Sequence, residues 1–164
     1  MTATTNVASS CGSRPSSACS EASLRIATKA GYFTPATGAD AVNAGVLTED
    51  QAVTGHSLAP DYVRWQTGRN REQLGREWLD LVLLHNPERA HPGAHPALHR
   101  AMRDAFVVLE EAVAAGQVAG YGMATWADLE EETFTVEELL ALAGEALGDS
   151  STTTWSRSRC RSAW

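Results

Sequence analysis

The sequence contains no apolar run long enough to cross a lipid bilayer, and its first residues lack the apolar segment of a secretory signal. It also lacks an excess of basic side chains. The formal net charge is −7 at pH 7, which argues against nucleic acid or an anionic membrane surface as a main partner. We therefore expect a cytoplasmic protein that binds neither nucleic acid nor membranes.

Cysteine is scarce and uneven in its placement. The three cysteines, Cys11, Cys19 and Cys160, lie near the ends of the chain, and no two have the CxxC spacing of a zinc site. Because three thiols cannot all pair within one chain, we interpret them as incidental.

Histidines offer the other candidate metal ligands. His91, His95 and His99 are four residues apart, which on a regular helix would form a stripe. Pro92 and Pro96 disrupt a regular helix there, so we expect no metal site.

Composition divides the chain into three zones. Residues 1–22 are rich in Ser, Thr and Ala and carry few charges, so we expect them to be disordered. Residues 23–148 carry the periodic apolar patterns of an ordered domain. Residues 149–164 form no plausible element where another strand is due.

Strands and helices are predicted to alternate within the middle zone. The expected order is a strand at 24–29, a helix at 59–75, a strand at 79–84, a helix at 96–116, a strand at 118–125, and a helix capped by Thr135 and Glu138 and ended by Gly148. Alternation of this kind is typical of an α/β fold with a parallel sheet and right-handed crossovers. The run LDLVLL predicts a strand that is buried on both faces.

The predicted strands end on residues with potential chemistry, namely Lys29, His85 and the segment Ala124-Thr125-Trp126. Function collects at the carboxyl ends of parallel strands. Alone, Lys29 is equally well explained as a solvated strand end, and a histidine after such a strand is more often a hydrogen-bonded structural group than a catalyst. Together they would face one mouth, where an ammonium lowers the pKa of a neighbouring hydroxyl and an imidazole polarises a carbonyl.

Three segments carry a family resemblance. LRIATKAGY, LDLVLLHNPE and LEEAVAAGQVAGYGMATW, taken in this order, resemble successive parts of the aldo-keto reductases over residues 24–148. The resemblance implies a (β/α)8 TIM barrel that reduces an aldehyde or ketone to an alcohol, or runs the reverse reaction, with NADPH and without a metal. NADH remains an alternative, because no segment that would bind the cofactor's phosphates is recognised.

The resemblance also implies roles for residues. In this family a tyrosine donates a proton to the carbonyl oxygen, a lysine paired with an aspartate lowers the pKa of that tyrosine, and a histidine orients the carbonyl. Lys29 matches the lysine and His85 matches the histidine. Ala124-Thr125 stands where members usually have Ser-Asn holding the nicotinamide carboxamide, and Thr125 retains a hydrogen-bonding hydroxyl.

Parts of the family pattern are missing. Residues 1–22 contain neither the aspartate nor the tyrosine, and the chain supplies about three of the eight units of a barrel. General acid catalysis contributes roughly 10²–10⁴-fold, so we expect this chain alone to be inactive.

The connection at residues 34–58 is predicted to be a loop over the barrel mouth, because it is rich in Gly, Thr and Ala. Tyr32 and Phe33 precede it. They would either line the substrate pocket or pack beneath this loop.

Residues 149–164 are interpreted as the product of a frameshift. If residues 150–164 are given GC-rich codons, a shifted reading yields QHHHLVAVQVPVSL, which resembles the next barrel strand. An ordinary unstructured tail is the alternative.

Two other functions stay open. The three strands would leave unpaired edges, so a non-catalytic half-barrel could associate with its own copies. Alternatively, Lys29 could act as a Schiff-base nucleophile, which requires burial that lowers its pKa.

Overall fold

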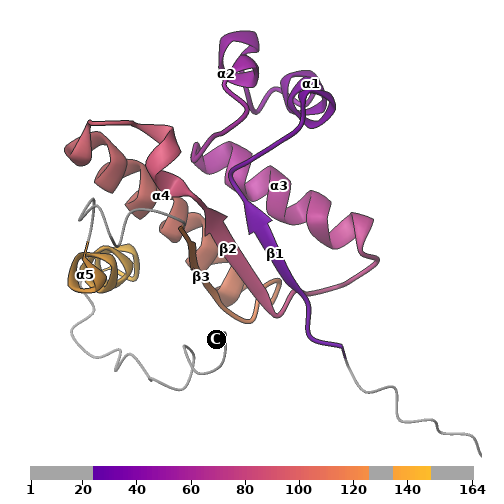
Figure 1. Ribbon diagram of the computed structural model, residues 1–164. Coiled ribbons are helices and arrows are strands. Elements are labelled where there is room, and N and C mark those ends of the chain that lie inside the picture. The colour runs from indigo at the N-terminus through magenta and orange to yellow at the C-terminus, as the bar shows by residue number, and fades with distance from the viewer. Residues whose placement is uncertain (1–23, 126–134, 149–164) are drawn as a thin grey trace, which may run out of the picture.

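The computed structural model describes residues 24–125 and 135–148 (Figure 1). The expectations of disorder for residues 1–22 and of a frameshift in residues 149–164 lie outside these residues. The elements in chain order are β1 (Ala27–Ala30), α1 (Pro35–Asn43), α2 (Glu49–Val53), α3 (Pro60–Gln73), β2 (Leu81–His85), the 3-10 helix η1 (Pro87–Ala90), α4 (His95–Ala114), β3 (Tyr121–Ala124) and α5 (Val136–Ala146).

The three strands form one parallel sheet in the order β1-β2-β3. Lys29 of β1 pairs with Leu83 of β2, and His85 of β2 pairs with Ala124 of β3. The predicted α/β class, the parallel sheet and the alternation of strands with helices are therefore confirmed. An open sheet of this kind is consistent with part of a TIM barrel.

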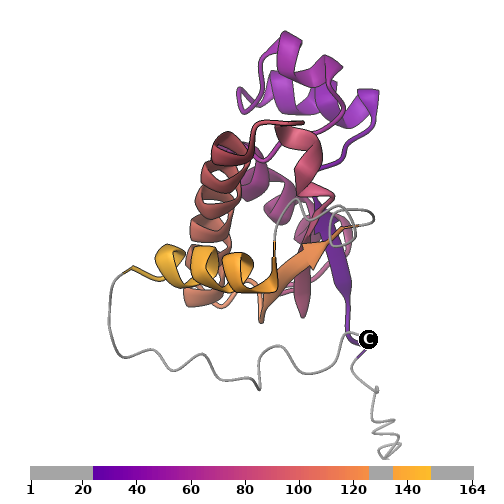
Figure 2. The same ribbon diagram turned by 60° about the vertical axis from the view of Figure 1, so that its left-hand side comes forward.

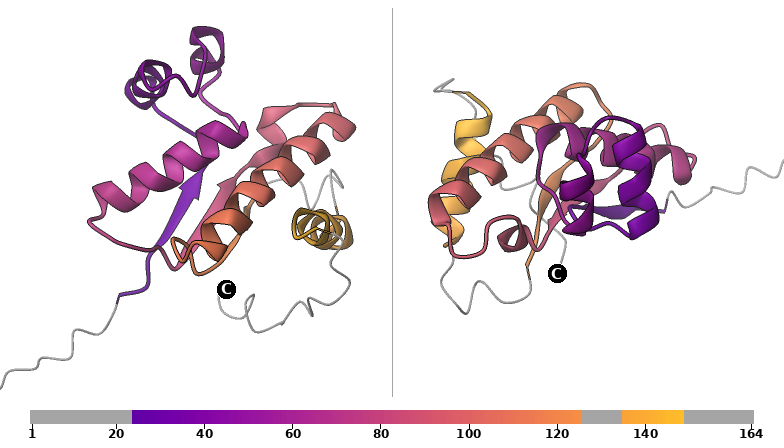
Figure 3. Two further views of the ribbon diagram at one scale, coloured as in Figure 1. Left: turned by 180° about the vertical axis from the view of Figure 1, so that it is seen from behind. Right: turned by 90° about the horizontal axis from the view of Figure 1, so that it is seen from above.

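Helices α3 and α4 cover one face of the sheet, as the view from behind shows (Figure 3, left). The strand side chains directed toward them are those of Thr28, Ala30, Val82, Leu84, Tyr121 and Met123. Val82 and Leu84 are fully buried, whereas Leu81 and Leu83, which alternate with them, are half-buried. The expectation that β2 is buried on both faces is wrong, because within the described residues helices cover only one of them.

Helix α4 supplies the largest part of this core. Its predicted stripe is confirmed, with Leu98, Met102, Phe106 and Leu109 buried against the sheet. Gly116, at φ +70°, ends the helix as the sequence predicted. Helix α5 packs against α4 (Figure 2) and begins at the predicted capping box of Thr135 and Glu138. No helix in the described part of the chain combines the length and the apolar character needed to span a membrane.

Residues 34–58 do not form a loop, contrary to the prediction, but contain helices α1 and α2 at the carboxyl end of β1 (Figure 1). Thr34 caps α1, with Pro35 in its first turn, and Thr48 forms a capping box with Gln51 at the start of α2. Gly45, at φ +72°, follows α1. These capping residues were visible in the sequence, and the Gly, Thr and Ala content that suggested a loop misled the prediction.

Candidate functional site

Lys29 and His85 lie on the same face of the sheet, opposite to α3 and α4. Side chains of paired residues in a parallel sheet point to the same side, so Lys29 shares a face with Leu83, and His85, two residues later on β2, shares that face as well. Lys29 is exposed, and His85 is half-buried. Burial and, second to it, the positive charge of Lys29 lower the pKa of His85 below its ordinary value of 6.5.

Tyr32 lies directly against His85. The ring centroids are 4.8 Å apart with an interplanar angle of 61°, and the Arg89 guanidinium carbon lies 5.8 Å from the Tyr32 ring centroid. Phe33, in contrast, packs beneath the segment of residues 34–58, which is the second of the two positions expected for Tyr32 and Phe33. Its ring lies 5.0 Å from that of Tyr62, in the small core beneath α1 and α2. The two neighbouring aromatics therefore separate, one toward His85 and one beneath the helices.

His56 was not singled out from the sequence, yet it belongs to this cluster. Its ring lies 5.0 Å from that of Tyr32 at an interplanar angle of 80°, and its Nε2 lies 2.9 Å from the backbone oxygen of His85. Gly31, at φ +125°, provides the space, because a Cβ there would come within 2.9 Å of His56 Nε2. No pattern around His56 marked it in advance.

Gln66 of α3 ties this region to the helix layer. Its Oε1 accepts a hydrogen bond from the Gly31 backbone N–H at 2.8 Å, and its Nε2 donates to the backbone carbonyl oxygen of Tyr32 at 3.0 Å. The side chain is buried. Gln66 lies four positions after Tyr62 on the same buried helix face, and nothing in the sequence marked this contact.

The family model described as the aldo/keto reductase family matches residues 12–135, which is most of the chain. The chain belongs to the aldo/keto reductase family. A comparison with curated proteins finds no match. Family membership establishes kinship with NAD(P)H-dependent carbonyl reductases, and the open parallel sheet agrees with part of the barrel of an aldo/keto reductase.

Thr125 follows β3 of this aldo/keto reductase chain, beside the end of β2. The Asn86 backbone N–H donates to the Ala124 oxygen at 2.7 Å, and Asn86 adopts φ +43° where the chain turns into η1. The Thr125 hydroxyl lies 3.5 Å from Glu88 Oε2, at the limit of a hydrogen bond. Binding of the nicotinamide carboxamide by Thr125 remains a prediction.

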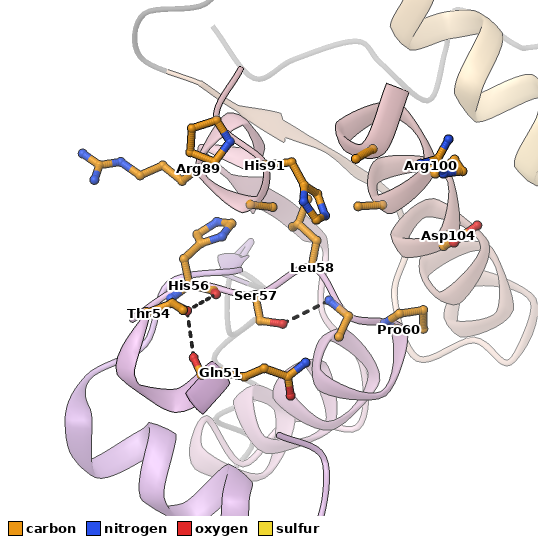
Figure 4. Close-up of a pocket in the computed structure, with 15 residues that line it drawn as sticks. Gln51, Thr54, His56, Ser57, Leu58, Pro60, Arg89, His91, Arg100 and Asp104 are labelled. Carbon is orange, nitrogen blue, oxygen red and sulfur yellow. Dashed lines mark hydrogen bonds between the residues drawn. The ribbon is translucent and has the colours of Figure 1, made fainter. Parts of the chain in front are cut away.

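A cavity of about 660 Å³ lies between the α2–α3 connection and the start of α4 (Figure 4). His56 and Arg89 contribute to its wall, but Lys29, His85 and Thr125 do not. The cavity is therefore lined by His56 but not by the residues that the sequence predicted for the site. Contrary to the prediction, Pro96 does not disrupt the helix at His95 and His99, because it lies in the first turn of α4, where proline is tolerated. The two rings have centroids 6.4 Å apart, and the described residues contain no group of three potential metal ligands.

The stability of the protein should fall as the pH is lowered from 7.5 to 5. Burial, the largest cause, lowers the pKa of both His56 and His85 from 6.5. The unfolded chain therefore binds these protons first, so their contribution is complete above about pH 6.5 and is lost as the pH falls below it. Urea unfolding as a function of pH measures this slope.

His56→Gln should flatten this pH dependence, because it removes the more deeply buried of the two titrating rings. His91→Gln is the matched control, since His91 is exposed. An identical slope in His56→Gln and in the unsubstituted chain would contradict the burial of His56.

Proposed function

We propose that the chain supplies the carbonyl-side residues of an NAD(P)H-dependent reductase site. The observation that carries this proposal is the shared face of Lys29 and His85 at neighbouring strand ends. A neutral His85 donates a hydrogen bond from a ring N–H to the carbonyl oxygen of an aldehyde or ketone, which polarises it for reduction. The charge of Lys29 favours this neutral form and lowers the pKa of a hydroxyl placed beside it.

NADPH is the proposed cofactor, with NADH as the alternative, and when bound it would supply a hydride to the carbonyl carbon. The residues near the end of β3 suit a flat nicotinamide ring. Gly122 and Ala124 lie on the same face as Leu83 and His85 and carry no bulky side chain. We propose that the Thr125 hydroxyl binds the carboxamide.

Titration of the chain with NADPH, followed by nicotinamide fluorescence, tests this assignment. We expect measurable binding that weakens in Thr125→Ala and persists in Thr34→Ala, which removes an exposed hydroxyl at the start of α1. Absence of NADPH binding would refute the cofactor proposal. No turnover of an aldehyde is expected, because the residues assigned here lack a tyrosine as general acid.

A second candidate function is self-association as a non-catalytic half-barrel. Within the described residues β1 and β3 each pair only with β2, so each presents an unpaired edge. Light scattering coupled to size-exclusion chromatography would give a mass that rises with concentration if copies pair through these edges. A constant mass of 17.5 kDa would refute it. We further propose a cytoplasmic location, which cell fractionation tests.

A further inference from the structure

His56 is linked to His85 by a direct hydrogen bond and by ring contacts that pass through Tyr32. Its Nε2 lies 2.9 Å from the His85 backbone oxygen, and because a carbonyl oxygen only accepts, Nε2 carries the proton and donates. Its ring also lies edge-on to Tyr32, whose ring in turn lies edge-on to the ring of His85. The first contact holds the end of β2, and the second restricts the orientation of the His85 ring.

Backbone hydrogen bonds fix the position of His56 relative to the end of β1. Tyr32 and His56 form an antiparallel bridge, and the Ser57 backbone N–H donates to the Gly31 oxygen at 3.0 Å. The Thr54 hydroxyl donates to the His56 oxygen at 2.8 Å. Since Gly31 leaves no room for a Cβ, the ring fits closely against the strand ends.

The surroundings of His56 favour its uncharged form. The groups that face it are Tyr32, the His85 ring and Arg89, and burial together with the charges of His85 and Arg89 lowers its pKa despite the backbone hydrogen bond. Its Nδ1 is buried and has no hydrogen-bond partner in the described part of the chain. Protonation would create a buried N–H without an acceptor, which is costly.

We propose that His56 is a positioning residue for His85, holding its backbone directly and its ring through Tyr32. The inference rests on the carbonyl role proposed for His85 and adds the group that fixes its orientation. A carbonyl that reaches this face then meets an imidazole whose direction is set before binding.

The test compares three variants of the full chain by NMR titration of the His85 ring. His56→Asn removes the donor to the His85 oxygen, whereas His56→Gln places an amide nitrogen near the position of Nε2 and retains it. Leu58→Ala is the control for lost stability, because Leu58 is 2% exposed and lies in the same segment. We expect the pKa of His85 to rise toward 6.5 only in His56→Asn. No rise there, or an equal rise in Leu58→Ala, would overturn the proposal.

A second measurement serves if His56→Asn does not fold. The nuclear Overhauser effect between the Tyr32 and His85 rings is followed as the pH is lowered from 7 in the unsubstituted chain and in His56→Gln, together with the ring chemical shifts that report protonation of His56. We expect the unsubstituted chain to lose it as His56 becomes protonated, and His56→Gln to keep it. Persistence in both after the chemical shifts show that His56 is protonated would refute positioning by His56. Neither readout requires a cofactor or a carbonyl, so failure of NADPH binding is distinguishable from failure here.

Discussion

Gly31→Ala should destabilise the protein more than the substitution of alanine for any other glycine of the described residues. The left-handed φ of +125° is strained for alanine, and the new Cβ would lie 2.9 Å from His56 Nε2 and 3.1 Å from the His85 oxygen. Strain and displacement together should lower the free energy of unfolding by about 3 kcal/mol. Urea unfolding at pH 7.5 measures the change.

Gly45→Ala is the matched control for this substitution. Gly45 also has a positive φ, +72°, but no atom lies within 4 Å of the position that its Cβ would take. Only the backbone cost of about 1 kcal/mol should remain. Equal losses in the two variants would show that the packing of His56 against Gly31 contributes nothing.

Leu84→Ala should cost about 3 kcal/mol, because it opens a cavity in the core between the sheet and its helices. Leu84 is fully buried and belongs to the cluster that α4 completes. Leu83→Ala, one residue away on the same strand, should cost about 1 kcal/mol, since that side chain is half-buried on the face shared with Lys29 and His85.

The difference between these two leucines tests whether the sheet is covered on one face only. Both variants remove the same atoms from the same strand, so their difference reports the environment. Thermal or urea unfolding of both proteins gives the comparison. If Leu83→Ala is as costly as Leu84→Ala, a covering layer lies over the face of Lys29 and His85.

The sequence was a good guide wherever local chemistry decided the structure. The apolar stripe of α4 and the capping box of Thr135 and Glu138 each specify a helix through neighbouring residues, and both were predicted. Thr34-Pro35 and Thr48 with Gln51 specify α1 and α2 in the same local way, although the composition of this segment is typical of a loop.

The surroundings of the site could not be predicted in this way. His56 reaches His85 across 29 positions of the chain, and Gln66 reaches Gly31 across 35. Contacts of such separation depend on how β1, α3 and β2 pack, which no local pattern encodes. One-sided burial of β2 was missed for a similar reason, because an apolar run does not reveal how many layers cover it.

The most direct test of the account is the pKa of His85 in Lys29→Met and Lys29→Arg, measured by NMR. Lys29 is the only lysine in the chain, so the substitution leaves a single, defined change of charge. If the two side chains share one face, removing the charge in Lys29→Met raises the pKa of His85, and Lys29→Arg, which keeps the charge, leaves it low. An unchanged pKa of His85 in Lys29→Met would show that Lys29 and His85 do not form a common site.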